Sequence, residues 1–352
     1  MTDSSRTTYA DSGVSIEAGD RAVSLMRDWV ENARRPEVVG GIGGFAGLFD
    51  ASSFKNYDRP LLAASADGVG TKVVIAQRMD VHDTIGFDLV GMLVDDLVVS
   101  GAEPLFLTDY IACGTVVPER IAAIVKGIAE ACIEAGCALL GGETAEHPGL
   151  LSPEEYDVAG STTGVVEAEK VLGAHLVRPG DAVIAMASSG LHSNGYSLAR
   201  HVFFDQAGWE LERHVDELGR TLGEELLVPT RLYARACLAL ADTPGVHAMS
   251  HITGGGLAAN LARVVPDSVS VRVDRSTWSP APIFDLIGSV GEVTRDDLEA
   301  TLNMGVGMVA VCAADAAERA LATLSQHGID SWQCGTVTEG GGGSVGLVSD
   351  YR

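Results

Sequence analysis

The sequence has little of what binds nucleic acid or crosses a membrane. It carries 24 Lys and Arg against 48 Asp and Glu in 352 residues, a formal net charge of -24. This acidic balance excludes broad electrostatic attraction to nucleic acid or to an anionic membrane. No window offers the roughly 18 unbroken apolar residues of a membrane span. An anionic ligand must therefore be bound locally, by backbone amides, helix N-termini, single basic residues or bound cations.

Paired cysteines are also absent. The six cysteines form no CxxC pair, and most lie in apolar surroundings such as EACIEAGCALL, so we expect reduced thiols in the core. The first residues, MTDSSRTTYADSG, show no basic segment followed by an apolar one. We therefore expect a cytoplasmic protein that is neither exported nor inserted into a membrane.

Glycine, in contrast, is abundant, with 42 residues against about 25 at the usual frequency of ~7%. The stretch SADGVGTKVV, residues 65–74, follows an apolar run but is not a P-loop. Gly68 and Gly70 are too close together, and Val73 stands where a P-loop has Ser or Thr. The glycine loop at 40–47 follows a charged segment instead of a strand, so it is a weak match to the dinucleotide fingerprint.

Helical and strand patterns alternate in two segments of the chain. Hydrophobic periodicity predicts, in the first segment, helices at 16–35, 84–101 and 118–136 and strands at 61–66, 105–112, 138–144 and 157–166. After Glu169 the alternation restarts, with strands at 181–187, 247–252, 268–273, 307–313 and 331–337, and helices at 196–204, 257–265, 282–290, 295–302 and 314–328. We predict an α/β fold of two domains, residues 1–170 and 171–352, with mixed sheets flanked by helices.

Four carboxylates lie at or near the ends of predicted elements and have apolar neighbours: Asp67, Asp96, Asp109 and Glu143. Carboxylates from separate elements can converge on a Mg²⁺ ion that bridges phosphates. The alternative for each is a helix cap, a turn residue or a solvated charge. Lys72, beside glycine amides, suits a phosphate, or is an exposed lysine at the start of a strand.

Two loops of the second segment lead into predicted helices: SGLHSNG (189–195) and TGGG (253–256). Unpaired N–H groups at such helix starts favour an anion, although single glycine loops are often only turns. His192 and His251 either donate to a phosphate or satisfy loop carbonyls. GGETAEHPG (141–149) reads as an ordered polar loop that matches no common zinc pattern. The residues alone indicate a phosphate and metal site, typical of nucleotide binding.

Taken together, the motifs resemble the phosphoribosylformylglycinamidine cyclo-ligase family, whose members are also called aminoimidazole ribonucleotide synthetases. The resemblance runs along nearly the whole chain, through RRPEVVGGIGGFAGLFD, SADGVGTK, HDTIGFDLVGMLVDDLVVSGAEPLFLTDY, GGETAEHPG, SSGLHSNGYSL, LLVPTRLY, HITGGG and NMGVGM. It implies a ligase of purine biosynthesis that uses ATP and Mg²⁺. The implied reaction closes the ring of formylglycinamidine ribonucleotide to aminoimidazole ribonucleotide and releases ADP and phosphate.

The family resemblance also implies a homodimer in which N-terminal strands of both subunits meet. Uncovered sheet edges, such as 61–66 or 105–112, would otherwise favour aggregation. Residues 1–170 are then the nucleotide-binding and dimerisation domain, and residues 171–352 complete the substrate cleft.

Roles for single residues follow from the resemblance by position. The expected catalytic residues are Asp67, Lys72, Asp96, Glu143 and His192, and the expected Mg²⁺ ligands are Asp67 and Asp96. The residues expected to bind ATP are Gly43, Gly44, Gly68, Gly70, Thr71, Lys72 and Asp109. The residues expected to bind the ribonucleotide are Glu143, Thr144, His192, Ser193, Asn194, Thr253, Gly254 and Gly255.

The chain departs from the family pattern at a few positions: Asp95 for the usual Asn, His147 for Met, and Ser12 and Ser15 for Ala and Asp. These differences put in doubt the metal stoichiometry and the shape of the GGET loop. Two alternatives stay open: another ATP-using member of the superfamily, similar to thiamine-monophosphate kinase, and a non-catalytic scaffold that responds to nucleotide. Selenophosphate synthetase is disfavoured because the N-terminal glycine loop has no Cys.

Overall fold

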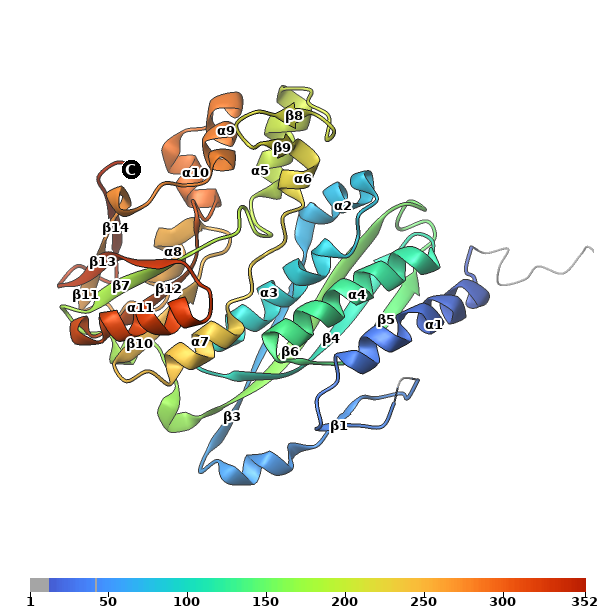
Figure 1. The fold of residues 1–352 in the computed structure, drawn as a ribbon, viewed down its shortest axis with the longest axis horizontal. Coiled ribbons are helices and arrows are strands. Elements are labelled where there is room, and N and C mark those ends of the chain that lie inside the picture. The colour runs from blue at the N-terminus through green and yellow to red at the C-terminus, as the bar shows by residue number, and fades with distance from the viewer. Residues whose placement is uncertain (1–12, 42) are drawn as a thin grey trace, which may run out of the picture.

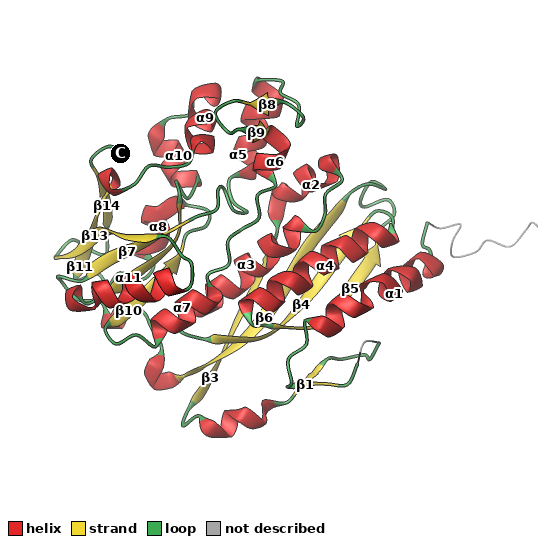
Figure 2. Ribbon diagram, viewed as in Figure 1, coloured by secondary structure: helices red, strands yellow, loops and turns green. Residues whose placement is uncertain are grey.

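The computed structural model describes residues 13–41 and 43–352 (Figure 1). Two separate sheets flanked by helices form the two halves of the molecule (Figure 2). The strands of the first large sheet end at Glu167, and those of the second begin at Ala182. Each sheet contains both parallel and antiparallel pairs, which confirms the α/β class with mixed sheets. The division at residue 170 stays a prediction.

The first sheet has the strand order β3-β6-β4-β5. Its strands are β3 (Pro60–Gly68), β4 (Glu103–Cys113), β5 (Ala138–Glu146) and β6 (Tyr156–Glu167). Strand β4 pairs with β5 in parallel and with β6 antiparallel. The expectation that 105–112 is an uncovered edge is therefore wrong. The chain returns through a helix after β4 and places β5 outside it, so β3 and β5 are the edges.

Helices cover one face of this sheet (Figure 1). They are α2 (Val73–Met79), α3 (Thr84–Val98) and α4 (Pro118–Ala135), with α1 (Ile16–Asn32) packed on α4. Glycine permits the close approach of α3, because a Cβ at Gly160 of β6 would lie 3.0 Å from Leu93 Cδ1. Between α1 and β3 run the small hairpin β1 (Val38–Val39) and β2 (Leu48–Phe49) and the 3₁₀ helix η2 (Ala51–Asn56).

The opposite face of the first sheet is exposed. On β3 the side chains of Leu62, Ala64 and Ala66 alternate with those that face α3, and all three are exposed. Leu62 is 64% exposed and Tyr110 of β4 is 42% exposed. No described helix packs on these residues, so the sheet presents a partly apolar surface on this side.

The second sheet has the order β10-β12-β7-β13-β11-β14. Its strands are β7 (Ala182–Ala187), β10 (Val246–His251), β11 (Val269–Asp274), β12 (Val306–Cys312), β13 (Ser331–Glu339) and β14 (Val345–Val348). Every residue of β12 is buried, which explains its unbroken apolar sequence. All six cysteines are free and buried, which confirms the expected core thiols. Strand β14, which pairs in parallel with β11, was not predicted.

The helices of the second half are α5 (Tyr196–Arg200), α6 (Leu222–Leu226), α7 (Ala234–Ala241), α8 (Gly256–Ala262), α9 (Pro282–Gly291), α10 (Arg295–Thr301) and α11 (Ala317–Gln326). The helix predicted over 196–204 is α5 followed by a π-helix, η6 (His201–Gln206). A short hairpin joins β8 (His214–Val215) to β9 (Arg220–Thr221). Helix α3 packs against both the first sheet and α7, so it lies at the junction of the two halves. None of the described helices combines the length and apolar character that a membrane crossing needs.

Candidate functional site

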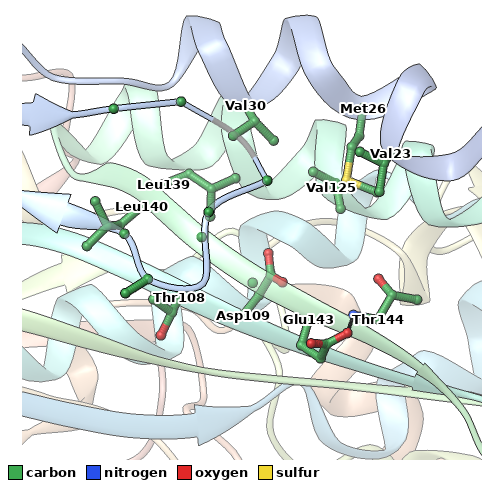
Figure 3. A pocket seen from close by; sticks show the side chains of 18 of the residues that line it. Val23, Met26, Val30, Thr108, Asp109, Val125, Leu139, Leu140, Glu143 and Thr144 are labelled. Carbon is green, nitrogen blue, oxygen red and sulfur yellow. Dashed lines mark hydrogen bonds between the residues drawn. The ribbon is translucent and has the colours of Figure 1, made fainter. Parts of the chain in front are cut away.

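A pocket of about 640 Å³ lies between α1, the glycine loop at 40–47 and the edge strand β5 (Figure 3). Its apolar wall comes from α1, α4 and β5: Val23, Met26, Val30, Val125, Leu139 and Leu140. Its polar floor comes from β4 and β5: Thr108, Asp109, Glu143 and Thr144. An apolar chamber with a few polar groups on one side is typical of a small-molecule site.

The glycine loop forms one side of this pocket. Gly40 and Gly43 have φ values of 90° and 100°, in the left-handed region that favours glycine. Arg34 holds the start of the loop by donating to the carbonyls of Val38 and Gly40. At the other end, a Cβ at Gly47 would lie 2.6 Å from Leu140 Cγ, so the loop passes close to β5. Gly43 and Gly44, both predicted to bind ATP, line the pocket between these two fixed points.

Strand register places Asp67 and Asp109 on one face of the first sheet. Both pair with Gly160 of β6, from opposite sides, and Asp109 also pairs with Gly142 of β5. Directly paired residues point to the same face, so the two carboxylates lie two strands apart, roughly 9–10 Å. Asp67, Gly160, Asp109 and Gly142 thus form one row across the sheet, in which only the two aspartates carry side chains. This row runs from the pocket at Asp109 to Asp67, near the junction of the two halves.

The side chain of Asp109 accepts no hydrogen bond from the described residues. A Cβ at Gly142 would lie 2.0 Å from Asp109 Oδ1, so only glycine at 142 leaves space for this side chain. Burial raises the pKa of Asp109 to about 7. Glu143 pairs with Tyr110 and points to the opposite face, so the pocket extends around the edge strand.

A second group of predicted residues lies at the junction of the two halves. His251 Nδ1 of β10 is 2.9 Å from Asp96 Oδ1 of α3, a hydrogen bond between the halves. The side chain of His251 is buried, whereas that of Asp96 is 39% exposed. Asp67, at the end of β3, accepts from its neighbour Gly68 N at 2.7 Å. Burial raises the pKa of Asp67 and the charge of Asp96 raises it further, whereas the hydrogen bond from Gly68 N and the charge of His251 lower it.

The carboxylates at this junction suit Mg²⁺ only together with a phosphate. The described residues contain no group of three or more His, Cys, Asp or Glu arranged to hold a metal ion by themselves. Mg²⁺, however, is usually bound through one or two carboxylates, with phosphates and water completing its shell. No Lys or Arg of the described residues forms an ion pair with Asp67 or Asp96. One oxygen of each carboxylate is engaged, by Gly68 N and by His251 Nδ1, which leaves the other oxygen of each to a ligand. Asp67 and Asp96 therefore fit a Mg²⁺ ion that is bound together with a phosphate group. Their role as Mg²⁺ ligands stays a prediction.

Lys72 does not have the surroundings expected of a phosphate ligand. Its side chain is fully buried, and Nζ donates to Asp88 Oδ1 at 2.7 Å, His192 O at 3.0 Å and Val228 O at 2.7 Å. An ammonium group has three N–H donors, and all three are used. The sequence suggested an exposed or ligand-facing lysine because two of its three partners, His192 and Val228, lie more than 100 residues away along the chain. The direct contact between Lys72 and a phosphate is therefore not supported by this geometry.

The SGLHSNG and TGGG loops meet at the same junction. Asn194 Oδ1 accepts from Gly254 N at 3.1 Å, and Ser193 Oγ donates to Val69 O of the first half at 2.6 Å. Thr253 Oγ1 lies 3.4 Å from Asn260 Oδ1 in α8, and Gly255, at φ 96°, is the residue that precedes this helix as its N-cap. Thr71 Oγ1 lies 3.2 Å from Ser197 Oγ. The predicted substrate residues of the second half thus adjoin the DGVGTK segment that includes Gly68 and Gly70.

His192 is buried at the centre of this arrangement. Its backbone has φ 62°, a left-handed value that is strained for a residue with a side chain. Its Nε2 accepts from Ser189 N at 3.1 Å, which leaves the proton of a neutral ring on Nδ1. Burial lowers the pKa of His192 well below its ordinary value, and the charges of His251, Lys72 and Arg231 act in the same direction. His192 is therefore neutral.

Sequence reasoning missed two participants at the junction and the partner of a third. His251 was considered as a donor to a phosphate or to loop carbonyls, whereas the structure places it on Asp96. Asp88 and Thr230 were not considered, yet Asp88 Oδ1 accepts from Thr230 N at 3.0 Å and from Thr230 Oγ1 at 2.6 Å. A buried Asp inside an apolar helix was the available signal for Asp88.

The departures from the family pattern have separate structural settings. Asp95 is buried and accepts from Tyr233 N at 3.1 Å, and burial raises its pKa to about 7. His147 Nε2 lies 3.2 Å from Tyr110 Oη. Ser15 caps α1 by accepting from Ala18 N at 3.2 Å. Ser12 lies outside the described residues.

Comparison with solved structures identifies the same fold. A thiamine-monophosphate kinase from Stenotrophomonas maltophilia K279a aligns with a TM-score of 0.68 at 19% identity, covering 96% of this chain and 98% of that one. A hydrogenase maturation protein HypE, in complex with ATP, aligns with a TM-score of 0.66 at 19% identity, covering 96% and 93% of the two chains. At these identities the likeness concerns the fold alone.

Sequence comparison is more specific. Residues 50–166 match the family described as AIR synthase related protein, N-terminal domain, and residues 178–348 match its C-terminal domain. The phosphoribosylformylglycinamidine cyclo-ligase of Geobacillus kaustophilus is 47% identical over 334 residues, 95% of this chain and 96% of that protein. That of Anaeromyxobacter sp. is 50% identical over 336 residues, 95% and 97% of the two chains. The chain therefore belongs to the AIR synthase related family, among the phosphoribosylformylglycinamidine cyclo-ligases.

Proposed function

We propose that this protein catalyses the ATP-dependent closure of formylglycinamidine ribonucleotide to aminoimidazole ribonucleotide, a step of de novo purine biosynthesis. The observation that carries the proposal is 47–50% identity to cyclo-ligases over 95% of the chain. The kinase-like alternative has only 19% identity behind it. A scaffold without activity would have no need of two carboxylates, Asp67 and Asp96, at the junction of the two halves.

The reaction transfers a phosphoryl group from ATP to the formyl oxygen of the substrate. The amidine nitrogen then bonds to the formyl carbon, and the carbon–oxygen bond breaks so that the oxygen leaves with phosphate. An amide oxygen is a poor leaving group until it is phosphorylated. Catalysis of this kind rests mainly on positioning and on neutralising phosphate charge.

We assign ATP to the pocket beside the glycine loop. Its apolar wall suits a base, its loop of glycines suits phosphates, and Asp109 on its floor suits a hydrogen-bond donor or a cation. HypE, which shares the fold, is described in complex with ATP. The row from Asp109 to Asp67 then leads from the nucleotide toward the second half of the molecule.

We assign Mg²⁺ to Asp67 and Asp96 and the ribonucleotide to the loops of the second half. Bound Mg²⁺ would neutralise charge on the transferred phosphoryl group. His251 holds Asp96 in place through the 2.9 Å hydrogen bond. Asn194, bridged to Gly254, fixes the two substrate loops relative to each other. A cytoplasmic location accords with a substrate of central metabolism and with six free thiols.

We also propose a homodimer that covers the exposed face of the first sheet. This face carries Leu62, Ala64, Ala66 and Tyr110, and β3 has an unpaired edge. Light scattering of the purified protein should give twice the chain mass. Leu62→Glu should shift it to the monomer, whereas Leu150→Glu, at an exposed loop residue, should not. A wild-type monomer across the micromolar range contradicts the dimer.

The function is tested by incubating the protein with ATP, Mg²⁺ and formylglycinamidine ribonucleotide. We expect the aminoimidazole product and ADP in equal amounts, and neither without the ribonucleotide. Transfer of phosphate to thiamine monophosphate, with no ring closure, would favour the kinase-like alternative. Nucleotide binding without turnover would favour the scaffold.

A further inference from the structure

Lys72 and Asp88 form a fully buried ion pair within the first half of the molecule, at its junction with the second half. Both side chains are 0% exposed, and Lys72 Nζ lies 2.7 Å from Asp88 Oδ1. Burial lowers the pKa of Lys72 and raises that of Asp88, and each partner opposes the other's shift. Such a pair is costly to bury and weak as a source of stability, so its presence calls for another role.

Each member of the pair binds the second half of the molecule. Lys72 donates to His192 O at 3.0 Å and to Val228 O at 2.7 Å. Asp88 accepts from both the backbone N and the hydroxyl of Thr230. The pair therefore fixes two segments of the second half, one around His192 and one at 228–230, to the first half.

The segment around His192 needs such fixing. His192 has a left-handed backbone, which costs on the order of 1–3 kcal/mol and persists only where its surroundings impose it. Its carbonyl is the group that Lys72 holds. The next residue, Ser193, donates to Val69 O, and Asn194 accepts from Gly254 N. Lys72 thus holds the carbonyl of His192, and the two residues that follow, Ser193 and Asn194, make contacts at the junction.

We propose that Lys72, paired with Asp88, is a positioning residue that holds the SGLHSNG loop in its binding conformation and does not contact ATP. The assignment of this loop to the ribonucleotide rests on the proposed function. The exclusion of Lys72 from the phosphates does not, because it follows from the burial and saturation of its ammonium group.

The first test uses the unmodified protein. Limited acetylation with acetic anhydride, followed by peptide mass spectrometry, reports which lysines are accessible. Lys55 and Lys170 are exposed and serve as internal references. We expect both to be modified and Lys72 to stay unmodified with and without Mg²⁺ and ATP. Modification of Lys72 in the absence of nucleotide overturns the proposal, whether or not ATP protects it.

The second test removes the pair. Lys72→Met alone would leave the Asp88 carboxylate buried without a cation, so the variant used is Lys72→Met with Asp88→Leu. Isothermal titration with ATP in the presence of Mg²⁺ should give a Kd for the variant within about threefold of the Kd for the wild-type protein. The KM for the ribonucleotide should rise at least about tenfold. Lys170→Met, at an exposed lysine, is the control for lysine loss and should change neither value.

Two results of the second test contradict the proposal. A Kd for ATP weakened tenfold or more means that Lys72 contributes to the nucleotide site. An unchanged KM for the ribonucleotide means that the loop does not depend on the pair. Failure of the proposed function is distinguishable, since the unmodified protein would then make no aminoimidazole product while acetylation and ATP binding could still be measured.

Discussion

The two sheets of this protein differ in how deeply their strands are buried. Every residue of β12 in the second sheet is buried, whereas no residue of β3 in the first sheet is fully buried. The neighbouring strands β7 and β12 of the second sheet are covered on both faces and read as continuous apolar sequence, whereas β11 alternates buried and less buried residues. The first sheet is covered on one face only, and its strands carry Asp67 and Asp109. The centre of the second sheet therefore serves packing alone, whereas the first sheet contributes to the core and also presents chemical groups and an exposed surface.

This difference leads to opposite expectations for substitutions. A change at Asp67 or Asp109 themselves should alter activity with little effect on folding. A change in the centre of the second sheet should alter folding and leave the chemistry of the folded fraction intact.

The largest expected effect is that of Asp67→Asn. The variant keeps the size of the side chain but loses a negative ligand, and losing one preorganised electrostatic group typically costs on the order of 10²- to 10³-fold in rate. Turnover at saturating substrates should fall by that factor, while the Tm in a thermal scan should change little. Unfolding of the variant, or near-normal turnover at limiting Mg²⁺, would make Asp67 a structural turn residue.

A double variant sharpens this prediction. If Asp67 and Asp96 serve one ion, Asp67→Asn with Asp96→Asn should lose less than the product of the two single losses. Steady-state rates of the four proteins give the coupling directly. Independent, multiplicative losses would show that the two carboxylates act separately.

Ile184→Ala tests the second sheet. Ile184 is fully buried in β7, which lies between β12 and β13. Removing the buried side chain should lower the free energy of unfolding by about 3 kcal/mol, within the usual range for Ile→Ala in a core. Denaturant unfolding measures this value. Ile133→Ala, at an exposed position of α4, is the matched control and should cost under about 0.5 kcal/mol. A large loss of turnover in folded Ile184→Ala would contradict the expectation that core changes in the second sheet leave the chemistry intact.

Gly142→Ala tests whether the position of Asp109 matters. The added Cβ would lie 2.0 Å from Asp109 Oδ1, so the carboxylate must move. Since small displacements in a site are costly, we expect the KM for ATP to rise about tenfold. The neighbouring Gly141→Ala meets nothing within 4 Å and is the control. Equal kinetics for the two variants would remove Asp109 from the nucleotide site.

The sequence predicted the elements whose patterns are local. Strands β7 and β12 are continuous apolar runs, and α1, α3 and α4 show clear helical periodicity, so all five were located. The places of Asp67 at the end of β3 and Asp96 near the end of α3 were also readable. These features depend on neighbours within one element.

What the sequence did not reveal depends on distant pairing. Lys72 is buried and donates to the carbonyl of Val228, 156 residues away. No local pattern around DGVGTK encodes this contact. Strand β4 is internal because β5 is added in parallel at its far side, a fact of topology. Strand β14 has only four residues and follows four glycines, too short a pattern to distinguish from a loop.

The smallest expected effect is a pH dependence of stability from Asp109. Burial raises its pKa in the folded protein to about 7 from an ordinary 3.8, so the folded state holds a proton that the unfolded state has lost between these values. Stability from this group is therefore present at low pH and declines as the pH rises toward 7. The limit for one proton is about 1.4 kcal/mol per pH unit, and because the carboxyl faces a pocket we expect a total of about 1 kcal/mol. Denaturant unfolding of the wild type and of Asp109→Asn between pH 5.5 and 7.5 should show the free energy of the wild type falling relative to the variant. Parallel curves would mean that Asp109 is ionised throughout, solvated like the exposed face of the first sheet and not buried like the core of the second.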